Sequence, residues 1–285
     1  MRKRAFCDSV EVMTAGSHIQ PHDPNSGFDT LSLDFGGSRV KSAVLDRQGN
    51  HLGTYFVDVV DYPFTPQLMI ETVIEHAQRH AVTCQRVTIG MPGIVRDGIV
   101  IHTPHYIRPA GPGGNVDPQL QEAWKNADIQ KLVENACHLP TLVVNDAIVA
   151  AAATIQGHGS ELILTLGTGL GIAFAVNGRL TEHIEVSHAP SPIGGTFDDV
   201  VGAINLPDTD SAQWSHHISQ VIDALWPMYR WDTLYIGGGN ALKLTDQVRA
   251  SLSERGATFL DYEAGARGGS ATWQYVPHIT RGACD

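Results

Sequence analysis

The segment TLSLDFGGSRVKSAVLDRQGN at residues 30–50 returns in altered form as ELILTLGTGLGIAFAVNGRL at residues 161–180. In each copy an apolar strand runs into a glycine-rich turn, and a second strand with β-branched residues follows. A further glycine turn then closes each copy, at Gly49 and at Gly178. The pattern predicts two α/β lobes that are weak duplicates of each other, each opening with a β-hairpin.

Length and composition agree with two lobes. The chain has 285 residues, of which 42% are hydrophobic and 17% charged, enough to bury two cores at about 150 residues per domain. Residues 1–28 are polar and show no apolar period, so we expect a flexible lead there. We expect a smaller N-terminal lobe at residues 29–140 and a larger C-terminal lobe at residues 141–285.

The other elements follow from apolar spacing. Strands are predicted as a three-stranded meander over residues 30–60 and as single strands over 86–90, 141–145 and 233–237. Helices are predicted where apolar residues recur every three or four positions, at 66–77 behind a Thr65 cap, 118–136, after Asp146, 214–226 up to a stop at Pro227, and 244–255.

Charge and composition exclude several classes of protein. The net charge of −11 argues against non-specific binding to nucleic acid or to an anionic membrane. No apolar run approaches the roughly 18 residues that span a bilayer, and the first residues lack the apolar core of a signal peptide, so we expect a cytoplasmic protein. The four cysteines lie far apart, which favours free thiols, and the histidine pairs lack the companion ligands of a zinc site.

The two glycine-rich turns are candidates for binding phosphate. Each runs from strand to strand and not from strand to helix, so neither is a dinucleotide fingerprint or a Walker loop. Glycine still lets backbone N–H groups approach phosphate oxygens closely, and two facing loops would form a clamp. Either turn alone would more often be an ordinary hairpin turn; one in each lobe favours the clamp.

Two carboxylates stand at the ends of buried-type strands. Asp34 has little structural reason to be there unless it serves a cation, and we interpret it as a magnesium-side carboxylate; the alternative is a residue that stabilises the turn. Asn145 and Asp146 close the strand at 141–145, and both residue types are favoured helix N-caps. One cap explains one of them, so Asp146 is a candidate general base for an attacking hydroxyl.

Four motifs in order resemble the ROK family of sugar kinases. They are DFGGSRVK at 34–41, GMPGIVRDGIV at 90–100, VVNDAIVAAAA at 143–153 and TLGTGLGIAFAVNGRL at 165–180. The resemblance implies two ribonuclease-H-like lobes around a central cleft, as in the actin-like, sugar-kinase and Hsp70 superfamily. Within the family the likeness is greatest to the polyphosphate glucokinases, on the Leu-Trp-Pro and Gly-Gly-Gly segment at 225–239 and on Asn-Val-Asp at 115–117.

Roles for individual residues come from this resemblance. It implies that Asp146 is the catalytic base and that the sugar is bound by Gly93, Asn115, Asn145, Asp146, Glu185 and His188. It implies that phosphate and metal are held by Asp34, Gly36, Gly37, Ser38, Lys41, Gly167, Thr168 and Gly169, with Gly238 and Gly239 beside a nucleotide and Mg²⁺ bound at Asp34 through water.

The chain also departs from the family pattern. The cysteine run that usually follows the sugar-site histidine is absent after His188, so no structural zinc is expected. The same region usually supplies another sugar-binding glutamate, and that contact has no assigned residue here. Ser187 stands where the family has glycine.

The expected function is transfer of a terminal phosphoryl group from polyphosphate or ATP, with Mg²⁺, to the 6-hydroxyl of a hexose, most readily glucose. Arg39 and Lys41 could begin a basic track for polyphosphate, or could be solvated loop charges. The resemblance implies a homodimer. A sugar-binding pseudo-kinase is the alternative; a DNA-binding repressor is poorly supported, because the sequence offers neither a reading domain nor a basic face.

Overall fold

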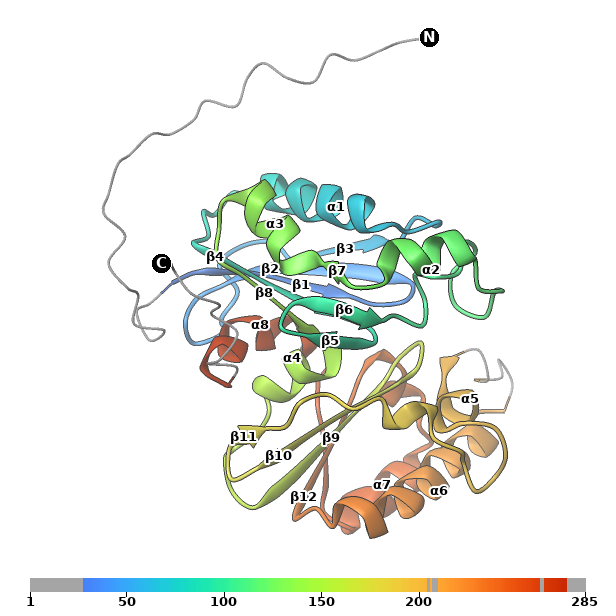
Figure 1. Ribbon diagram of the computed structural model, residues 1–285. Helices are drawn as coiled ribbons and strands as arrows, with labels where there is room; N and C mark the ends of the chain where they lie inside the picture. The colour runs from blue at the N-terminus through green and yellow to red at the C-terminus, as the bar shows by residue number, and fades with distance from the viewer. Residues whose placement is uncertain (1–27, 204–205, 207–209, 262–263, 276–285) are drawn as a thin grey trace.

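The computed structural model describes residues 28–203, 206, 210–261 and 264–275. The lead expected at residues 1–28 therefore lies outside the described residues, except for Phe28 at its end. Two five-stranded sheets form separate lobes, stacked one above the other in Figure 1. The fold is of the α/β class with two lobes, as the duplicated sequence pattern predicts.

The first sheet has the strand order β3-β2-β1-β4-β8. Its strands are β1 (Thr30–Phe35), β2 (Arg39–Leu45), β3 (Phe56–Val59), β4 (Arg86–Met91) and β8 (Thr141–Asn145). β1 pairs antiparallel with β2 and parallel with β4, and β4 pairs parallel with β8. Helices α1 (Pro66–Arg79) and α3 (Ile129–Cys137) lie over one face of this sheet (Figure 1).

The second sheet repeats this arrangement with the order β11-β10-β9-β12-β13. Its strands are β9 (Ser160–Leu166), β10 (Leu170–Val176), β11 (Arg179–Leu180), β12 (Thr233–Gly237) and β13 (Ala257–Phe259). Helices α5 (Phe197–Val201), α6 (Ser211–Tyr229) and α7 (Asp246–Glu254) lie on its outer side (Figure 1). Both glycine-rich turns are hairpin loops, because β1–β2 and β9–β10 are antiparallel pairs.

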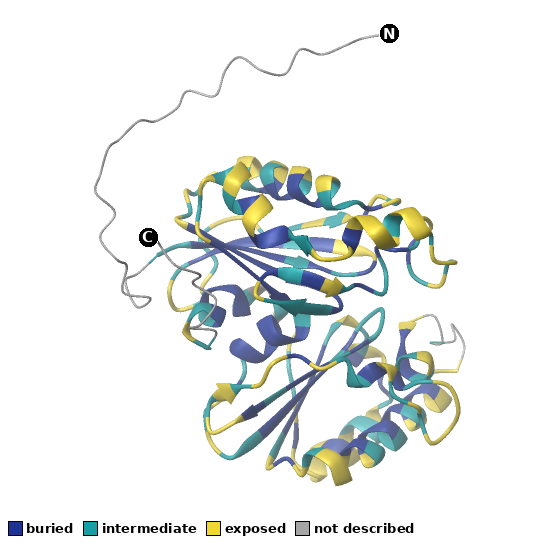
Figure 2. Ribbon diagram, viewed as in Figure 1, coloured by how far each residue is buried: buried dark blue, intermediate teal, exposed yellow. Residues whose placement is uncertain are grey.

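Two helices lie between the sheets. They are α4 (Asp146–Ala152) and α8 (Ala264–Tyr275), which pack against each other, and α4 is coloured as buried along its length in Figure 2. α8 approaches its neighbours closely because of its glycines. A Cβ on Gly268 would lie 1.7 Å from the Val149 carbonyl oxygen, and one on Gly269 would lie 2.1 Å from Ser32 Oγ.

The lobe boundary expected between residues 140 and 141 differs from the observed sheets. β8 is a strand of the first sheet and not the start of the second lobe. α8 also returns to the first sheet, where Thr88 Oγ1 donates to the Gly269 carbonyl at 2.7 Å. Both differences arise from contacts between residues far apart in the chain, which local patterns do not encode.

Some element limits also differ from expectation. The helix predicted over 118–136 is two helices, α2 (Pro118–Trp124) and α3, separated by β7 (Ala127–Asp128), which joins β5 (Ile94–Arg96) and β6 (Ile99–His102) in a three-stranded sheet. Asn126 breaks the helix with a positive φ of 57°. Helix α6 continues past Pro227 to Tyr229, and the capping residue that follows, Arg230, has a positive φ of 48°.

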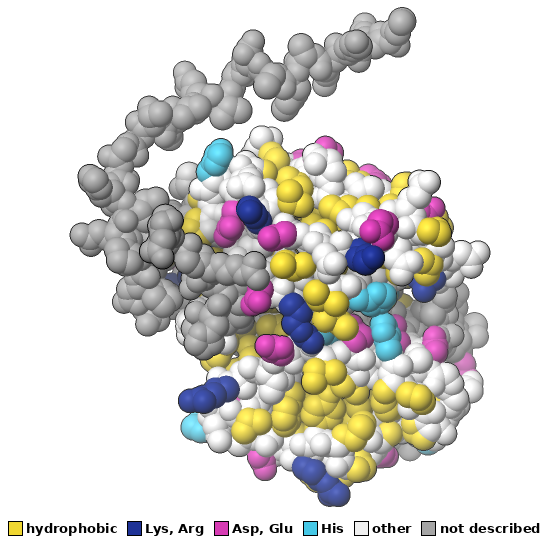
Figure 3. All heavy atoms as spheres, in the orientation of Figure 1, with side chains coloured by type: hydrophobic (Ala, Val, Ile, Leu, Met, Phe, Trp, Pro, Cys, Tyr) yellow, Lys and Arg dark blue, Asp and Glu magenta, His cyan; other side chains and the backbone are white. Residues whose placement is uncertain are grey.

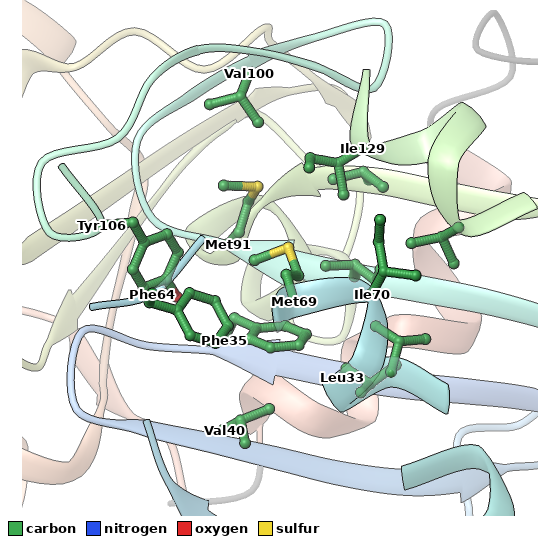
Figure 4. Close-up of a cluster of buried hydrophobic side chains, with 14 of the residues drawn as sticks. Leu33, Phe35, Val40, Phe64, Met69, Ile70, Met91, Val100, Tyr106 and Ile129 are labelled. Atoms are coloured by element: carbon green, nitrogen blue, oxygen red, sulfur yellow. The ribbon is translucent and has the colours of Figure 1, made fainter. Parts of the chain in front are cut away.

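An aromatic cluster packs beside the first glycine loop. Figure 4 shows Phe35, Phe64 and Tyr106 together, and the ring centroids of Phe64 and Tyr106 lie 4.8 Å apart. Trp124 joins them and donates from Nε1 to the Phe64 carbonyl at 2.9 Å. This packing fixes the end of β1, where Asp34 lies.

Among the described helices, none combines the length and apolar character needed to cross a bilayer.

Candidate active site

A cavity of about 480 Å³ lies where the two lobes meet. Both glycine loops, the end of β1 and the start of α4 line it, and so do residues of the segment between β11 and α5. Of the residues proposed from the sequence, the cavity is lined by Asp34, Gly36, Gly37, Ser38, Lys41, Gly93, Asn145, Asp146, Gly167, Thr168, Gly169, Glu185, His188, Gly238 and Gly239. Nearly all of the proposed site is therefore brought together.

Asn115 is the exception. It is exposed in the loop before α2 and is not among the residues that line the cavity. Two residues further on, Asp117 caps α2 by accepting hydrogen bonds from Gln119 N and Leu120 N, at 2.8 and 2.9 Å. The Asn-Val-Asp segment thus has a structural part in starting a helix, through its aspartate.

The first loop is held by two tyrosines. Tyr62 donates its hydroxyl to the Gly37 carbonyl at 2.7 Å, and Tyr106 donates to the Gly36 carbonyl at 3.0 Å. A Cβ on Gly37 would lie 2.8 Å from the ring of His105, a residue of the cavity wall that the sequence interpretation left aside. The loop is thereby fixed in a shape that admits no side chain at position 37.

The second loop is held by Asp198 and Asn240. Leu170 N donates to Asp198 Oδ1 at 2.6 Å, and Asn240 Nδ2 donates to the Gly167 carbonyl at 2.8 Å. A Cβ on Gly169 would lie 2.4 Å from Asp198 Oδ1. Gly238 is constrained as well, because its φ is +87° and its Cβ would lie 2.4 Å from the Leu166 carbonyl oxygen.

Asp34 and Lys41 form an ion pair beside the first loop. Lys41 Nζ lies 2.9 Å from Asp34 Oδ2, and the two side chains are 19% and 16% exposed. β1 and β2 bring them together, because Asp34 pairs directly with Lys41 across the hairpin. The ammonium that was proposed for phosphate is therefore engaged with the carboxylate proposed for magnesium.

Asn145 and Asp146 have separate parts at the start of α4. Asn145 is the N-cap and accepts from Ala147 N at 2.8 Å, while its amide donates to the Gly93 carbonyl at 2.9 Å. Gly93 has a φ of +104°, and a Cβ there would lie 2.1 Å from the His102 carbonyl oxygen. Asp146 Oδ1 accepts from the same Ala147 N at 2.9 Å, and the Asp146 side chain lines the cavity.

Asp146 has a strongly perturbed pKa. Burial, and after it the negative charge of Asp34, raise the pKa of this carboxyl to about 7, although the nearby His183 opposes the shift. A carboxylate with a pKa near neutrality can accept a proton from an attacking hydroxyl and hold it. This is the electrostatic property expected of a general base.

Glu185 is a further carboxylate of the cavity, and two side chains hydrogen-bond to it. Ser187 Oγ donates to Glu185 Oε1 at 2.5 Å, and His183 Nε2 lies 3.4 Å from Oε2. Burial raises the pKa of Glu185, but the hydrogen bonds from His183 and Ser187 outweigh it, so the pKa lies below its usual range. His188 meets His102 of the first lobe edge to face, with ring centroids 5.9 Å apart, and Figure 3 shows histidines gathered on the surface between the lobes.

The cavity residues that sequence reasoning missed include His105, His183 and Asp198. Asp198 was within reach, because it is an acidic residue in the very segment, after His188, where a further sugar-binding glutamate was sought. Burial raises the pKa of Asp198. The two histidines carry no such signal, since their packing against Gly37 and Glu185 depends on the folded chain.

The residues fit a magnesium ion that is bound mainly by the phosphates of the phosphoryl donor. No group of three or more His, Cys, Asp or Glu side chains suited to a metal occurs within the described part of the chain. Mg²⁺ needs no such cage, since it keeps several waters and is usually bound through one or two carboxylates and substrate phosphates. Asp34, near the end of β1, supplies one carboxylate in the cavity wall.

Residues 30–185, more than half of the chain, match the model of the ROK family. The chain belongs to the ROK family. The matched region runs from β1 to Glu185 and therefore contains the first hairpin, Asp146 and the second glycine loop.

Similar proteins include glucokinases. The polyphosphate glucokinase of Mycobacterium tuberculosis is 26% identical over 257 residues, which cover 85% of this chain and 86% of that protein. The glucokinase of Streptomyces coelicolor is 28% identical over 159 residues, which cover 53% of this ROK chain but 44% of the relative. The chain thus spans less than half the length of that relative.

Solved structures share the fold. The inorganic polyphosphate/ATP-glucomannokinase of Arthrobacter superposes with a TM-score of 0.71 at 24% identity, covering 86% of this chain and 98% of that one. A ROK glucokinase of Streptomyces griseus superposes with a TM-score of 0.67 at 18% identity, covering 85% and 98%. These likenesses confirm the two-lobed actin-like fold implied by the sequence motifs.

Proposed function

We propose that this ROK protein is a hexose kinase that transfers the terminal phosphoryl group of ATP or polyphosphate to the 6-hydroxyl of glucose. The observation that carries the proposal is Asp146, a carboxylate with a pKa of about 7 in a cavity that both glycine loops and Glu185 also line. The names of the relatives, glucokinase and polyphosphate glucokinase, support glucose as acceptor and both compounds as donors.

In the proposed reaction, the 6-hydroxyl gives its proton to Asp146 and its oxygen attacks the terminal phosphorus. The bond from that phosphorus to the bridging oxygen of the donor breaks, and the electron pair leaves with ADP or the shortened polyphosphate. The two loops contribute chiefly by holding the donor in line with the acceptor. Asp34 would hold Mg²⁺, which when bound neutralises charge on the phosphate oxygens.

The donor is proposed to enter past Arg39. This residue is exposed at the start of β2, beside the first loop, and it lines the cavity; unlike Lys41, it has no carboxylate partner among the described residues. A polyanion longer than ATP would gain more from such a charge, because its later phosphates extend beyond the cavity. We therefore expect Arg39→Ala to weaken use of long-chain polyphosphate about tenfold or less, and use of ATP by a smaller factor.

Product formation tests the proposed function. The purified chain is incubated with glucose and either ATP or long-chain polyphosphate, and sugar phosphate is measured, with Arg39→Ala beside Arg47→Ala, an exposed arginine outside the cavity lining. Glucose 6-phosphate from either donor supports the proposal. Binding of glucose without any product would favour the pseudo-kinase, and equal polyphosphate use by Arg39→Ala would refute the entry path.

A further inference from the structure

Glu185 has a partner on each of its carboxylate oxygens. Ser187 Oγ donates to Oε1 at 2.5 Å and His183 Nε2 lies 3.4 Å from Oε2, so the chain two residues before and two residues after Glu185 turns back onto it. A carboxylate offers about four lone-pair sites. Each oxygen therefore keeps capacity to accept a further hydrogen bond from a ligand in the cavity that Glu185 lines.

Both anchoring side chains are buried. Burying a polar side chain costs free energy unless it makes a hydrogen bond. Ser187 is 3% exposed and His183 is 6% exposed. His183 Nδ1 is buried and makes no hydrogen bond to the described residues. A buried polar atom without a hydrogen bond costs free energy, so such atoms are rare unless the side chain has another role. The ring is thus turned so that its other nitrogen faces Glu185.

The position of His183 is also fixed from the other lobe. Arg96 of β5 donates from Nη1 to the His183 carbonyl oxygen at 2.9 Å, and its Nε lies 3.6 Å from Glu182 Oε2. The segment that carries Glu185 belongs to the second lobe, between β11 and α5. The anchors of Glu185 are therefore held where the two lobes meet.

We propose that His183 and Ser187 are positioning residues that hold the Glu185 carboxylate as a fixed double acceptor for two hydroxyl groups of the acceptor substrate. This inference rests on the proposed function and deepens it, because it assigns the residues that orient the sugar-binding carboxylate. An anchored carboxylate close to Asp146 and Asp198 favours neutral, hydroxyl-rich substrates and disfavours acidic sugars such as uronic acids. Of the two anchors, Ser187 departs from the family pattern, because serine stands there where the family has glycine.

The test compares Ser187→Ala, His183→Ala and His183→Gln with the parent protein. Each hydrogen bond to a charged group typically contributes enough for about a tenfold effect. We expect Ser187→Ala and His183→Ala to raise the KM and the calorimetric Kd for glucose about tenfold, with kcat changed less than about threefold. Glutamine can place an amide donor near the position of Nε2, so His183→Gln should recover most of the affinity.

A second readout separates positioning from a general structural role. Among monodeoxy glucoses, the sugars that lack a hydroxyl bound by Glu185 should lose little further affinity in Ser187→Ala, whereas glucose loses about tenfold. Ser191→Ala and His216→Ala are matched controls, since both residues lie outside the cavity lining and should leave KM unchanged.

The outcomes are distinct. Unchanged KM and Kd in both alanine variants, a fall in kcat alone, or an equal loss for glucose and every deoxy sugar would overturn the proposed positioning role. A parent that binds glucose but forms no sugar phosphate would contradict the proposed kinase, while the Kd values would still decide whether Glu185 is anchored as described. A parent that neither binds nor phosphorylates any hexose would overturn both.

Discussion

Asp146 is the residue at which burial and charge have the greatest chemical effect. Its pKa is raised to about 7 first by burial and then by Asp34, while His183 acts in the opposite direction. A base of this pKa is half ionised near neutral pH, so its protonation state should control the rate there. Two kinetic measurements test this effect.

The first concerns the pH dependence of kcat/KM. In the free protein Asp146 must be ionised to accept a proton, so kcat/KM for glucose should fall as pH drops through about 7, with a tenfold loss per unit below it. Initial rates between pH 5 and 9 at fixed donor check this. A profile that stays flat down to pH 5 would show that the base has an ordinary pKa or is another group.

The second concerns removal of the base. Asp146→Asn should lower kcat by about 10² to 10⁴, the usual contribution of general base catalysis, while the Kd for glucose stays within a few-fold of the parent value. Asp61→Asn, at an exposed position outside the cavity, is the matched control. Turnover of Asp146→Asn near the parent rate would remove Asp146 from its proposed role.

At the scale of elements, close packing explains why glycine occurs where it does. The two hairpin loops contact the cavity, and α8 lies against α4 and β1. Gly169 leaves no room for a methyl group beside Asp198, and Gly268 leaves none beside the Val149 carbonyl. A substitution at Gly169 should weaken binding of the phosphoryl donor, whereas one at Gly268 should lower the stability of the fold.

In the second loop, Gly169→Ala should raise the KM for the donor about tenfold or more. A Cβ there would lie 2.4 Å from Asp198 Oδ1, so either the loop or the Asp198 carboxylate that holds Leu170 N must shift. The KM for glucose should change less. Gly53→Ala is the control, since a Cβ there would make an ordinary contact at 3.5 Å. Donor kinetics equal to the parent in Gly169→Ala would show that the loop does not bind the donor.

In α8, Gly268→Ala should destabilise the protein by about 1–3 kcal/mol, as is usual for overpacked interiors. An exposed helical glycine changed to alanine would gain up to about 1 kcal/mol, so the sign of the effect separates packing from helix propensity. Chemical denaturation of the variant and the parent measures it. A stabilised Gly268→Ala variant would contradict the close approach of α8 to α4.

The elements also show what sequence can predict. The hairpins, the Thr65 and Pro66 helix start and the glycine loops depend on neighbours in the chain, and the structure contains each of them. The pairing of β8 with the first sheet and the return of α8 depend on distant contacts, and the predicted lobe boundary missed both. Asn115 was proposed from a motif resemblance, but none of residues 115–117 lines the cavity, since a likeness in sequence does not fix where a loop lies in the fold.

For the whole molecule, the cavity places several carboxylates in one enclosed space between the lobes. Asp34, Asp146, Glu185 and Asp198 all line it. Concentrated negative charge is unfavourable without a cation or a proton, and it makes the stability of the fold depend on pH.

The sign of this dependence follows from Asp146. Its pKa in the folded protein, about 7, lies above the value of 3.8 for an unperturbed aspartate, so the folded state holds the proton more tightly than the unfolded chain. That stabilisation is complete below about pH 4 and is lost as pH rises to about 7. We expect the Tm of Asp146→Asn to equal that of the parent near pH 4 and to exceed it by several degrees at pH 8. A constant Tm difference across this range would contradict the raised pKa.

A measurement of phosphoryl transfer to glucose tests the central claim most directly. Phosphorus NMR of the protein with glucose, Mg²⁺ and either ATP or long-chain polyphosphate follows donor loss and product gain in one sample, with Asp146→Asn as the comparison. The account predicts a growing sugar 6-phosphate signal matched by ADP or shortened polyphosphate, and a rate lower by about 10² or more in the variant. Release of inorganic phosphate without any sugar phosphate, or equal rates in both proteins, would contradict it.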